Sequence, residues 1–423
     1  MDDDELEVIV ERSAGLDVHK DTVAVTVRVP GDDGSVHKHR AEFSTFTEDV
    51  CALRDWLVGF GVTRVGMEAT GVYWKPVYYV LEDEFECWLL NARHMHNVPG
   101  RKTDMADSDW ICRLVRFGLV RRSFVPPKPI RELRNLTRYR RTRMEERTRE
   151  VQRLDKVLQD AGVKLSSVAS DILGRSGRDM LDALVAGSRD PAVLAELARG
   201  RLRTKLPQLQ AALNGRFGPN HALVIGEILA HLDYLDESVA RLQAGIDELI
   251  APFADARDLL CSIPGVDAVL AEAIIGEIGV DMSAFPTASH LASWAGMCPG
   301  QHESAGKNRH GTARHGDSWL QRNLTVAAMA AARSKGTYLA AQYGRLVRRR
   351  GKKRARKAVA HSILVGCWHI LHDRVTYNEL GGDYFDRRQD PARIARRKLN
   401  ELRALGWTIT HNPDGTSTLT PAA

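Results

Sequence analysis

The sequence predicts an α/β domain followed by all-α regions, and three observations support this prediction. Strand-like and helix-like patterns alternate over residues 1–127, which is typical of a mixed sheet covered by helices. Residues 130–165 form one long polar stretch with helical spacing. From residue 166 to 250 the chain is rich in Ala and Leu with short breaks near Gly187 and Gly215, and a second compact helical region begins at 251.

The order of the elements supports the α/β prediction. Two strands lie within residues 14–29, on either side of the turn "DVHKD", and a third spans 36–43. The remaining expected elements are a helix in "FTEDVCALRDWLVGFG", a buried strand in "VTRVGMEATG" that stops at Gly71, a helix in "YWKPVYYVLED", a strand in "FECWLLNA" and an amphipathic helix over 105–118 that ends at Gly118. The proline-rich "VPPKP" at 125–129 then ends the domain.

The polar helix predicted at 130–165 carries only a thin apolar seam. The seam residues are Met144, Val151, Leu154 and Leu158, and their partial heptad spacing is compatible with a coiled coil. A helix of this kind favours oligomerisation over folding the later domain back on the first. The chain closes with "GWTITHNPDGTSTLTPAA", in which "NPDG" predicts a small hairpin. We therefore expect four regions: 1–127, 128–250, 251–345 and 346–423.

Composition excludes several classes of protein. Hydrophobic residues make up 43% and charged residues 27%, as in globular proteins, and no run approaches the roughly 18 apolar residues of a membrane span. The acidic start "MDDDELEVIVE" lacks the features of a secretion signal. Six scattered cysteines without a C-x-x-C argue for a reducing cytosol. The expected location is therefore the cytoplasm, with no membrane partner.

The net charge of +6 is concentrated in two segments. Lys128 to Arg153 holds ten Lys or Arg and four Glu, so a solvated helix face is as good an interpretation as a binding surface. The run "RLVRRRGKKRARK" from Arg345 to Lys357 holds nine cations and no acid, which favours nucleic acid. The expected phosphate-binding cations in this run are Arg345, Arg348, Arg349, Arg350, Lys352 and Lys353.

Four carboxylates are the candidate metal ligands. Asp17 and Glu68 lie at the ends of predicted strands, and Asp104 and Asp107 share one face at a helix start. Asp109 lies on another face and is left out. Such a cluster needs a compensating cation, and a pair of Mg²⁺ ions suits oxygen ligands and phosphodiester chemistry. Taken singly, the same acids could be helix-start, turn and surface residues.

This arrangement resembles that of an RNase H-like or RuvC-like nuclease. Three segments of the sequence resemble one particular family of such proteins. "GLDVHKDTVAV", "GMEATGVYW" and "GRKTDMADSDWICRLVRFGLVRRSFVPP" resemble the DEDD transposases of bacterial insertion sequences, the IS one-ten family. The resemblance implies that Asp17, Glu68, Asp104 and Asp107 form the family's acidic tetrad. It also implies that the chain acts as a bridge-RNA-guided recombinase.

The later part of the chain resembles the same family independently. "LLCSIPGVDAVLAEAIIGEIG" is similar to its helix-hairpin-helix-like segment, where the Pro264–Gly265 turn could bind a phosphate or simply join two helices. Ser304 lies in a Gly-rich stretch and would by itself be a turn residue; the resemblance makes it the nucleophile. Neighbouring cations that could hold phosphate are Lys307, Arg309 and Arg314.

The resemblance implies DNA strand exchange through a covalent phosphoserine, without a nucleotide cofactor. It implies DNA and a guide RNA as partners, and a homo-oligomer, dimer or tetramer. Two other functions stay open. A Holliday-junction-type endonuclease would use water and the same carboxylates, leaving Ser304 dispensable, and a non-catalytic RNA- or DNA-binding protein would show no metal-dependent activity.

Overall fold

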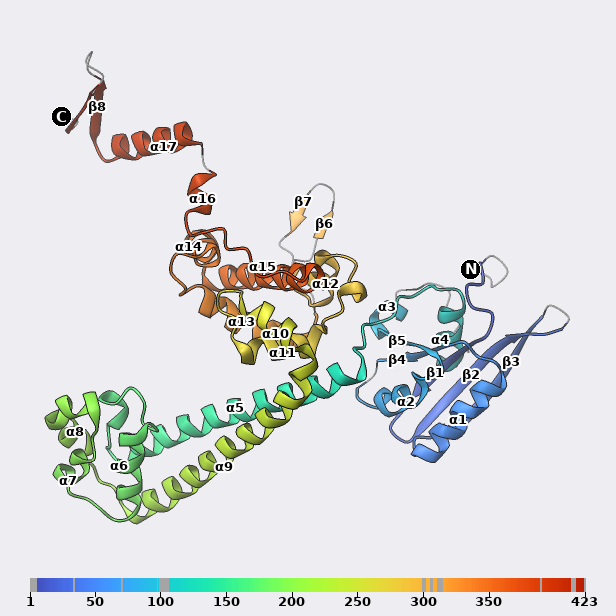
Figure 1. Ribbon diagram of the computed structural model, residues 1–423, viewed down its shortest axis with the longest axis horizontal. Coiled ribbons are helices and arrows are strands. Elements are labelled where there is room, and N and C mark those ends of the chain that lie inside the picture. The colour runs from blue at the N-terminus through green and yellow to red at the C-terminus, as the bar shows by residue number, and fades with distance from the viewer. Residues whose placement is uncertain are drawn as a thin grey trace. The chain divides into compact units, whose positions relative to one another are not determined.

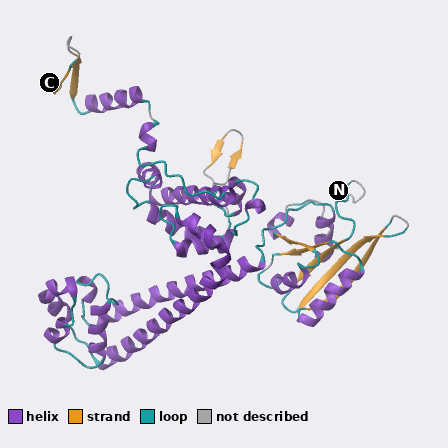
Figure 2. Ribbon diagram, in the orientation of Figure 1, coloured by secondary structure: helices purple, strands orange, loops and turns teal. Residues whose placement is uncertain are grey.

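The computed structural model describes residues 6–32, 35–69, 71–96, 98, 106–298, 302–304, 307–309, 315–388, 390–411 and 416–421. The chain divides into two compact units, Met1–Val125 and Pro126–Ala423, which we call the N-terminal and C-terminal units. Figure 2 shows that the first contains the mixed sheet and that the second is mainly helical. The predicted α/β domain followed by helical regions is therefore confirmed.

The N-terminal unit is built on a five-stranded sheet with strand order β3-β2-β1-β4-β5 (Figure 1). β1 (Ser13–Val18) pairs antiparallel with β2 (Thr22–Pro30), which pairs antiparallel with β3 (Val36–Ser44). On its other side β1 pairs parallel with β4 (Arg64–Glu68), and β4 pairs parallel with β5 (Glu86–Leu90). The strand predictions are thus confirmed in type and order.

One face of the sheet carries the main core of this unit. Leu16, Val25 and Val65 are fully buried or nearly so, and they belong to one cluster with side chains of the two helices α1 (Thr47–Gly59) and α2 (Trp74–Leu81). Alternation along each strand sends every second residue to the opposite face. That opposite face contacts α4 (Asp107–Arg116). A short helix, α3 (Ala92–His96), follows β5.

Two glycines allow α4 to lie directly on the sheet. Gly15 and Gly66 are register partners on β1 and β4. A Cβ at Gly15 would lie 2.2 Å from the carbonyl oxygen of Ser108, and one at Gly66 would lie 2.4 Å from a methyl group of Val115. Both distances are far below contact, so side chains there would push the helix away. The start of α4 is therefore held beside the ends of β1 and β4.

The C-terminal unit begins with a long pair of helices, α5 (Lys128–Asp160) and α9 (Pro219–Ile250). Residues nearer the start of α5 contact residues nearer the end of α9: Arg140 contacts Gln243, and Arg147 contacts Asp236. At the opposite ends, Asp160, the last residue of α5, contacts His221 in the first turn of α9. The two helices are therefore antiparallel, and α9 runs back along α5 (Figure 1).

This pairing shows what covers the apolar seam of the polar helix. Leu154 and Leu158 are fully buried, but within the chain itself, in a core that includes α9 residues. Met144, the first residue of the predicted seam, is 42% exposed. The seam at Leu154 and Leu158 therefore needs no second chain to cover it, because α9 supplies the apolar partner surface. The expected oligomerisation stays a prediction.

Short helices join the far ends of the pair. They are η2 (Leu165–Ser167), α6 (Arg175–Val185), α7 (Pro191–Glu196), η3 (Gly200–Lys205) and α8 (Leu206–Leu213). Their buried side chains share one core with the ends of α5 and α9. Breaks fall after α6, at Gly187, and just before α9, as the sequence predicts.

A helical body follows α9. Its helices are η4 (Ala251–Phe253), α10 (Ala254–Cys261), α11 (Ala268–Ile278), η5 (Met282–Ala284), α12 (Ala288–Trp294), α13 (Ser318–Ala331), α14 (Tyr338–Arg350) and α15 (Lys352–Asp373). α15 contacts α10, α12, α13 and α14. The expected boundary at residue 345 falls inside α14.

The last elements are small. They are α16 (Tyr384–Arg387), α17 (Pro391–Ala404), and the antiparallel strands β8 (Trp407–His411) and β9 (Ser417–Pro421). The strands confirm the predicted hairpin, whose turn lies outside the described residues. Within the described part of the chain, no helix combines the length and apolar character needed to cross a membrane.

Candidate functional site

Three of the four predicted acids lie at one edge of the N-terminal sheet. Leu16 pairs with Met67, so the next residues along these parallel strands are Asp17 and Glu68. Both follow Gly15 and Gly66 by two positions, which places them on the face covered by α4. Asp107 is the first residue of that helix. The fourth acid, Asp104, lies outside the described residues.

The electrostatics of Asp17 confirm that these acids are near one another. Burial raises the pKa of Asp17, the nearby His19 lowers it, and the negative charges of Asp107 and Glu68 raise it again; the net direction is upward. His19 Nε2 lies 3.2 Å from an Asp17 carboxylate oxygen. The like charges of Glu68 and Asp107 disfavour ionisation of Asp17, and a bound cation would relieve this repulsion.

No group of three or more His, Cys, Asp or Glu side chains is arranged to hold a metal ion within the part of the chain that the structure describes. The donor chemistry of the edge nevertheless fits a hard divalent cation, since Asp17, Glu68 and Asp107 all offer carboxylate oxygens.

Asp109, which the sequence argument leaves out, has a different environment. Its side chain is 2% exposed and contacts Arg28 at 2.7 Å, Lys38 at 2.7 Å and Arg40 at 3.1 Å. Burial alone would raise the pKa of Asp109, but hydrogen bonds from Lys38 and Arg28 outweigh it and the pKa lies below its usual range. Asp109 therefore ties α4 to β2 and β3 and is not available to the acidic edge.

The first basic segment is largely neutralised inside the protein. Arg138 pairs with Glu277, Arg140 with Glu272, and Arg147 with Asp236. Further cations of α5 have partners as well: Arg134 with Glu277, Arg141 with Glu145, Arg143 with Glu146 and Arg153 with Glu150. These ion pairs favour the structural interpretation of the segment Lys128 to Arg153.

The second basic run is different. It covers the last turns of α14, Gly351 and the first turns of α15. Most of its cations are exposed, and no carboxylate among the described residues lies within ion-pair distance of the set Arg348, Arg349, Arg350, Lys352 and Lys353. Arg345 lies over the ring of Phe385 at 4.9 Å. An unneutralised surface of this kind suits a phosphate backbone.

Ser304 belongs to the C-terminal unit. It is the last residue of β6 (His302–Ser304), which pairs antiparallel with β7 (Lys307–Arg309), and its register partner is Lys307. Lys307 and Arg309 therefore lie on the strand that faces Ser304. The turn between the strands, and Arg314, lie outside the described residues. The serine and the acidic edge belong to different units of the chain.

The Pro264–Gly265 turn joins α10 to α11, as the resemblance implies. Gly265 has φ = 89°, and a Cβ there would lie 2.5 Å from backbone atoms of Ala327 and Ala331 on α13. Asp267 caps α11 by accepting a hydrogen bond from the Leu270 N–H at 2.9 Å. Because close packing and a carboxylate occupy this turn, the structure favours a purely structural helical hairpin.

Sequence reasoning missed three residues that contribute to the acidic edge. The sequence predicts His19 only as part of a turn, although its position two residues after Asp17 is a signal for a partner of that carboxylate. Nothing in the sequence distinguishes Gly15 and Gly66, because each glycine is unremarkable until the strands are placed in register. Spacing within one segment reveals neither relation.

An acidic edge on a mixed sheet, in a chain that also has an unneutralised basic run, is typical of proteins that act on nucleic acid. Comparison with known proteins gives the family. Residues 14–162 match the family described as "Transposase" under the name DEDD_Tnp_IS110, and residues 257–345 match "Transposase IS116/IS110/IS902 family". Together these ranges cover more than half of the chain, which therefore belongs to the IS110 (IS one-ten) family of transposases.

Two relatives support this assignment. A "Probable family 20 transposase" from Pseudomonas aeruginosa is 25% identical over 237 residues, 56% of this chain and 61% of that protein. The "Insertion element IS110 uncharacterized 43.6 kDa protein" from Streptomyces coelicolor is 33% identical over 110 residues, 26% of each chain. The matched stretch is thus shorter than two thirds of either relative.

Proposed function

We propose that this protein is the transposase of an insertion sequence, which cuts and rejoins DNA strands with Ser304 as nucleophile. The observation that carries this proposal is the gathering of Asp17, Glu68 and Asp107 at one sheet edge, in a chain of the IS110 family. The five-stranded mixed sheet with acids at the ends of β1 and β4 supports an RNase H-like or RuvC-like domain.

The acidic edge would hold divalent metal. Asp17, Glu68 and Asp107, together with Asp104, would be its ligands, and two Mg²⁺ ions, when bound, supply positive charge that stabilises a phosphodiester during displacement. Asp109 stays with Arg28, Lys38 and Arg40 and takes no part. His19, 3.2 Å from Asp17, helps to orient that carboxylate.

Ser304 performs the covalent step. Its hydroxyl oxygen bonds to a DNA phosphorus, the bond from phosphorus to a deoxyribose oxygen breaks, and the serine proton is lost to solvent while the leaving oxygen gains one. The phosphoserine conserves the phosphodiester energy, so a second DNA hydroxyl can reverse the step without a nucleotide cofactor. Lys307 and Arg309 on β7, with Arg314, would hold phosphate oxygens.

The basic run of α14 and α15 would bind the backbone of DNA or of an element-encoded guide RNA. Its cations lack carboxylate partners among the described residues, unlike those of α5. Sequencing the small RNAs that co-purify with the protein tests whether it binds an element-encoded guide RNA. Exchange of two strands needs several serines held together, so we expect a homo-oligomer, dimer or tetramer.

Replacing ligands of the acidic edge tests the metal. Asp107→Asn and Glu68→Gln should abolish strand cleavage in Mg²⁺ and spare nucleic-acid binding. Mg²⁺ should raise the unfolding temperature of the wild-type protein but not of these two variants. The control is Asp55→Asn, which removes an exposed acid of α1 and should change neither property. Full cleavage by Asp107→Asn would contradict the proposed metal site.

A further inference from the structure

The segment that carries Ser304 starts after α12 and ends before α13, and the two ends are in direct contact. Gly316, just before α13, packs on the end of α12: a Cβ at this position would lie 2.3 Å from the carbonyl carbon of Ala295 and 2.4 Å from the nitrogen of Gly296. Ala295 is fully buried. Only a residue without a side chain lets the two backbones approach this closely.

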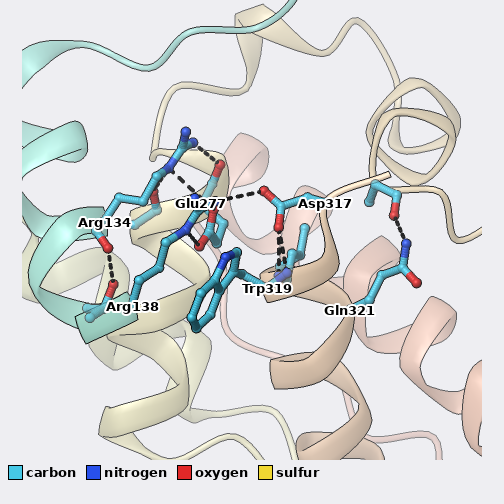
Figure 3. Close-up of polar contacts among 10 residues, drawn as sticks. Arg134, Arg138, Glu277, Asp317, Trp319 and Gln321 are labelled. Carbon is cyan, nitrogen blue, oxygen red and sulfur yellow. Dashed lines mark hydrogen bonds and ion pairs between the residues drawn. The ribbon is translucent and has the colours of Figure 1, made fainter. Parts of the chain in front are cut away.

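A side chain of α13 reinforces this contact. Gln321 donates a hydrogen bond from Nε2 to the carbonyl oxygen of Ala295 at 2.8 Å, which Figure 3 draws at its labelled Gln321. The other atom of the same amide, Oε1, accepts from Lys357 of α15 at 2.9 Å. Because each half of the amide has its own partner, the orientation of Gln321 is fixed from both sides.

The end of the serine-bearing segment that precedes α13 is also fixed to α5. Asp317 accepts hydrogen bonds from the backbone N–H groups of Trp319 and Leu320 at 2.9 Å each, so it caps α13. Its other oxygen lies 3.2 Å from Arg138, which makes two 2.7 Å hydrogen bonds to the buried Glu277 of α11 (Figure 3). The segment therefore leaves and re-enters the protein at a rigid junction of α5, α11, α12 and α13.

We infer that Gly316, Gln321 and Asp317 form a clamp that positions the serine-bearing segment for the covalent step. They are positioning residues, since none of them touches the reacting atoms. The inference rests on the proposed role of Ser304 for its consequence in catalysis. The clamp itself depends only on the contacts above, so it can be tested separately.

Hydrogen exchange of the full-length protein tests the clamp without reference to chemistry. Gly316→Ala should force the two ends apart, and Gln321→Glu should place a carboxylate against the Ala295 carbonyl while keeping an acceptor for Lys357. Each should speed exchange at least tenfold in peptides covering the end of α12 and the start of α13, residues 291–298 and 315–321, and leave α6–α8 peptides unchanged. Thr325→Ala is the control, because this hydroxyl donates only within α13, to the Gln321 carbonyl. Unchanged exchange in both variants would overturn the clamp.

Activity then tests the positioning role. With a constant affinity for nucleic acid, Gln321→Glu should slow single-turnover strand cleavage at least tenfold. Asp317→Asn keeps the helix cap but loses the charge that faces Arg138, and it should be slowed less than Asp317→Ala. Faster exchange with an unchanged cleavage rate would overturn the positioning role. If wild-type protein forms no DNA adduct at Ser304, the proposed function fails while the exchange data still decide the clamp.

Discussion

Asp107 and Asp109 lie two positions apart and have opposite surroundings. Asp107 is exposed at the start of α4, near Asp17, whereas Asp109 is buried among Arg28, Lys38 and Arg40. The sequence predicts that Asp109 lies on another face of the helix than Asp104 and Asp107. The partners of Asp109 could not be predicted, because the three cations come from strands some seventy to eighty positions earlier in the chain. Only the folded sheet brings them to Asp109.

Substitution of the two acids should therefore separate stability from function. Asp109→Asn leaves Arg28 buried without a full countercharge and should lower the free energy of opening of the N-terminal unit by about 3–5 kcal/mol. The matched change Asp107→Asn removes an exposed acid near a helix start and should cost less than about 1 kcal/mol. Hydrogen exchange of peptides from β1 and α4 measures both values. Equal effects would contradict the assignment of Asp109 to the fold.

At the scale of elements, the contact between α4 and the sheet decides where the acids lie. Gly15→Ala should destabilise the N-terminal unit by at least about 1–3 kcal/mol, because the new methyl group would overlap backbone atoms of Ser108 and Cys112. It should also impair metal-dependent cleavage by moving Asp107. Gly59→Ala is the control: nothing lies within 4 Å of its Cβ, so stability should hold or rise slightly. If Gly15→Ala changed neither the stability nor the cleavage rate, α4 would not need this close approach to the sheet.

The two basic segments make a second comparison between elements. Arg348, Arg349 and Arg350 changed together to Ala should flatten the salt dependence of RNA or DNA binding by up to about three phosphate equivalents. Arg141, Arg143 and Arg147 changed to Ala remove the same formal charge, but these cations have intramolecular partners. Their loss should leave the slope unchanged. Equal slopes for the two triple variants would mean that net charge alone governs binding.

Local patterns predicted most elements because each depends on neighbours in sequence. β1, β2, the helix α1 and the break before α9 all match the expectation. The partner of α5 could not be predicted in this way. A thin seam at Leu154 and Leu158 has the same appearance whether a second chain or a later helix covers it. The seam is also sparse because α5 and α9 are held together partly by ion pairs such as Arg147–Asp236.

At the scale of the whole molecule, the antiparallel pairing of α9 with α5 brings the helical body that follows α9 into contact with α5. The helical body that follows α9 contacts the early part of α5 through Arg134, Arg138 and Arg140. The long stretch between Asp107 and Ser304 therefore does not act as a simple spacer. Each unit contributes one half of the proposed chemistry: carboxylates from the N-terminal unit and a serine from the C-terminal unit.

The most direct measurement of this account is to identify the atom that becomes linked to DNA. Full-length protein with its co-purified RNA, Mg²⁺ and plasmid DNA carrying the ends of the element should be denatured, digested and examined by mass spectrometry. We predict a nucleotide linked to the peptide that contains Ser304, and no such product from Ser304→Ala or Asp107→Asn. Cleavage by Ser304→Ala, with no DNA-linked peptide in the wild-type protein, would contradict the account and identify water as the nucleophile.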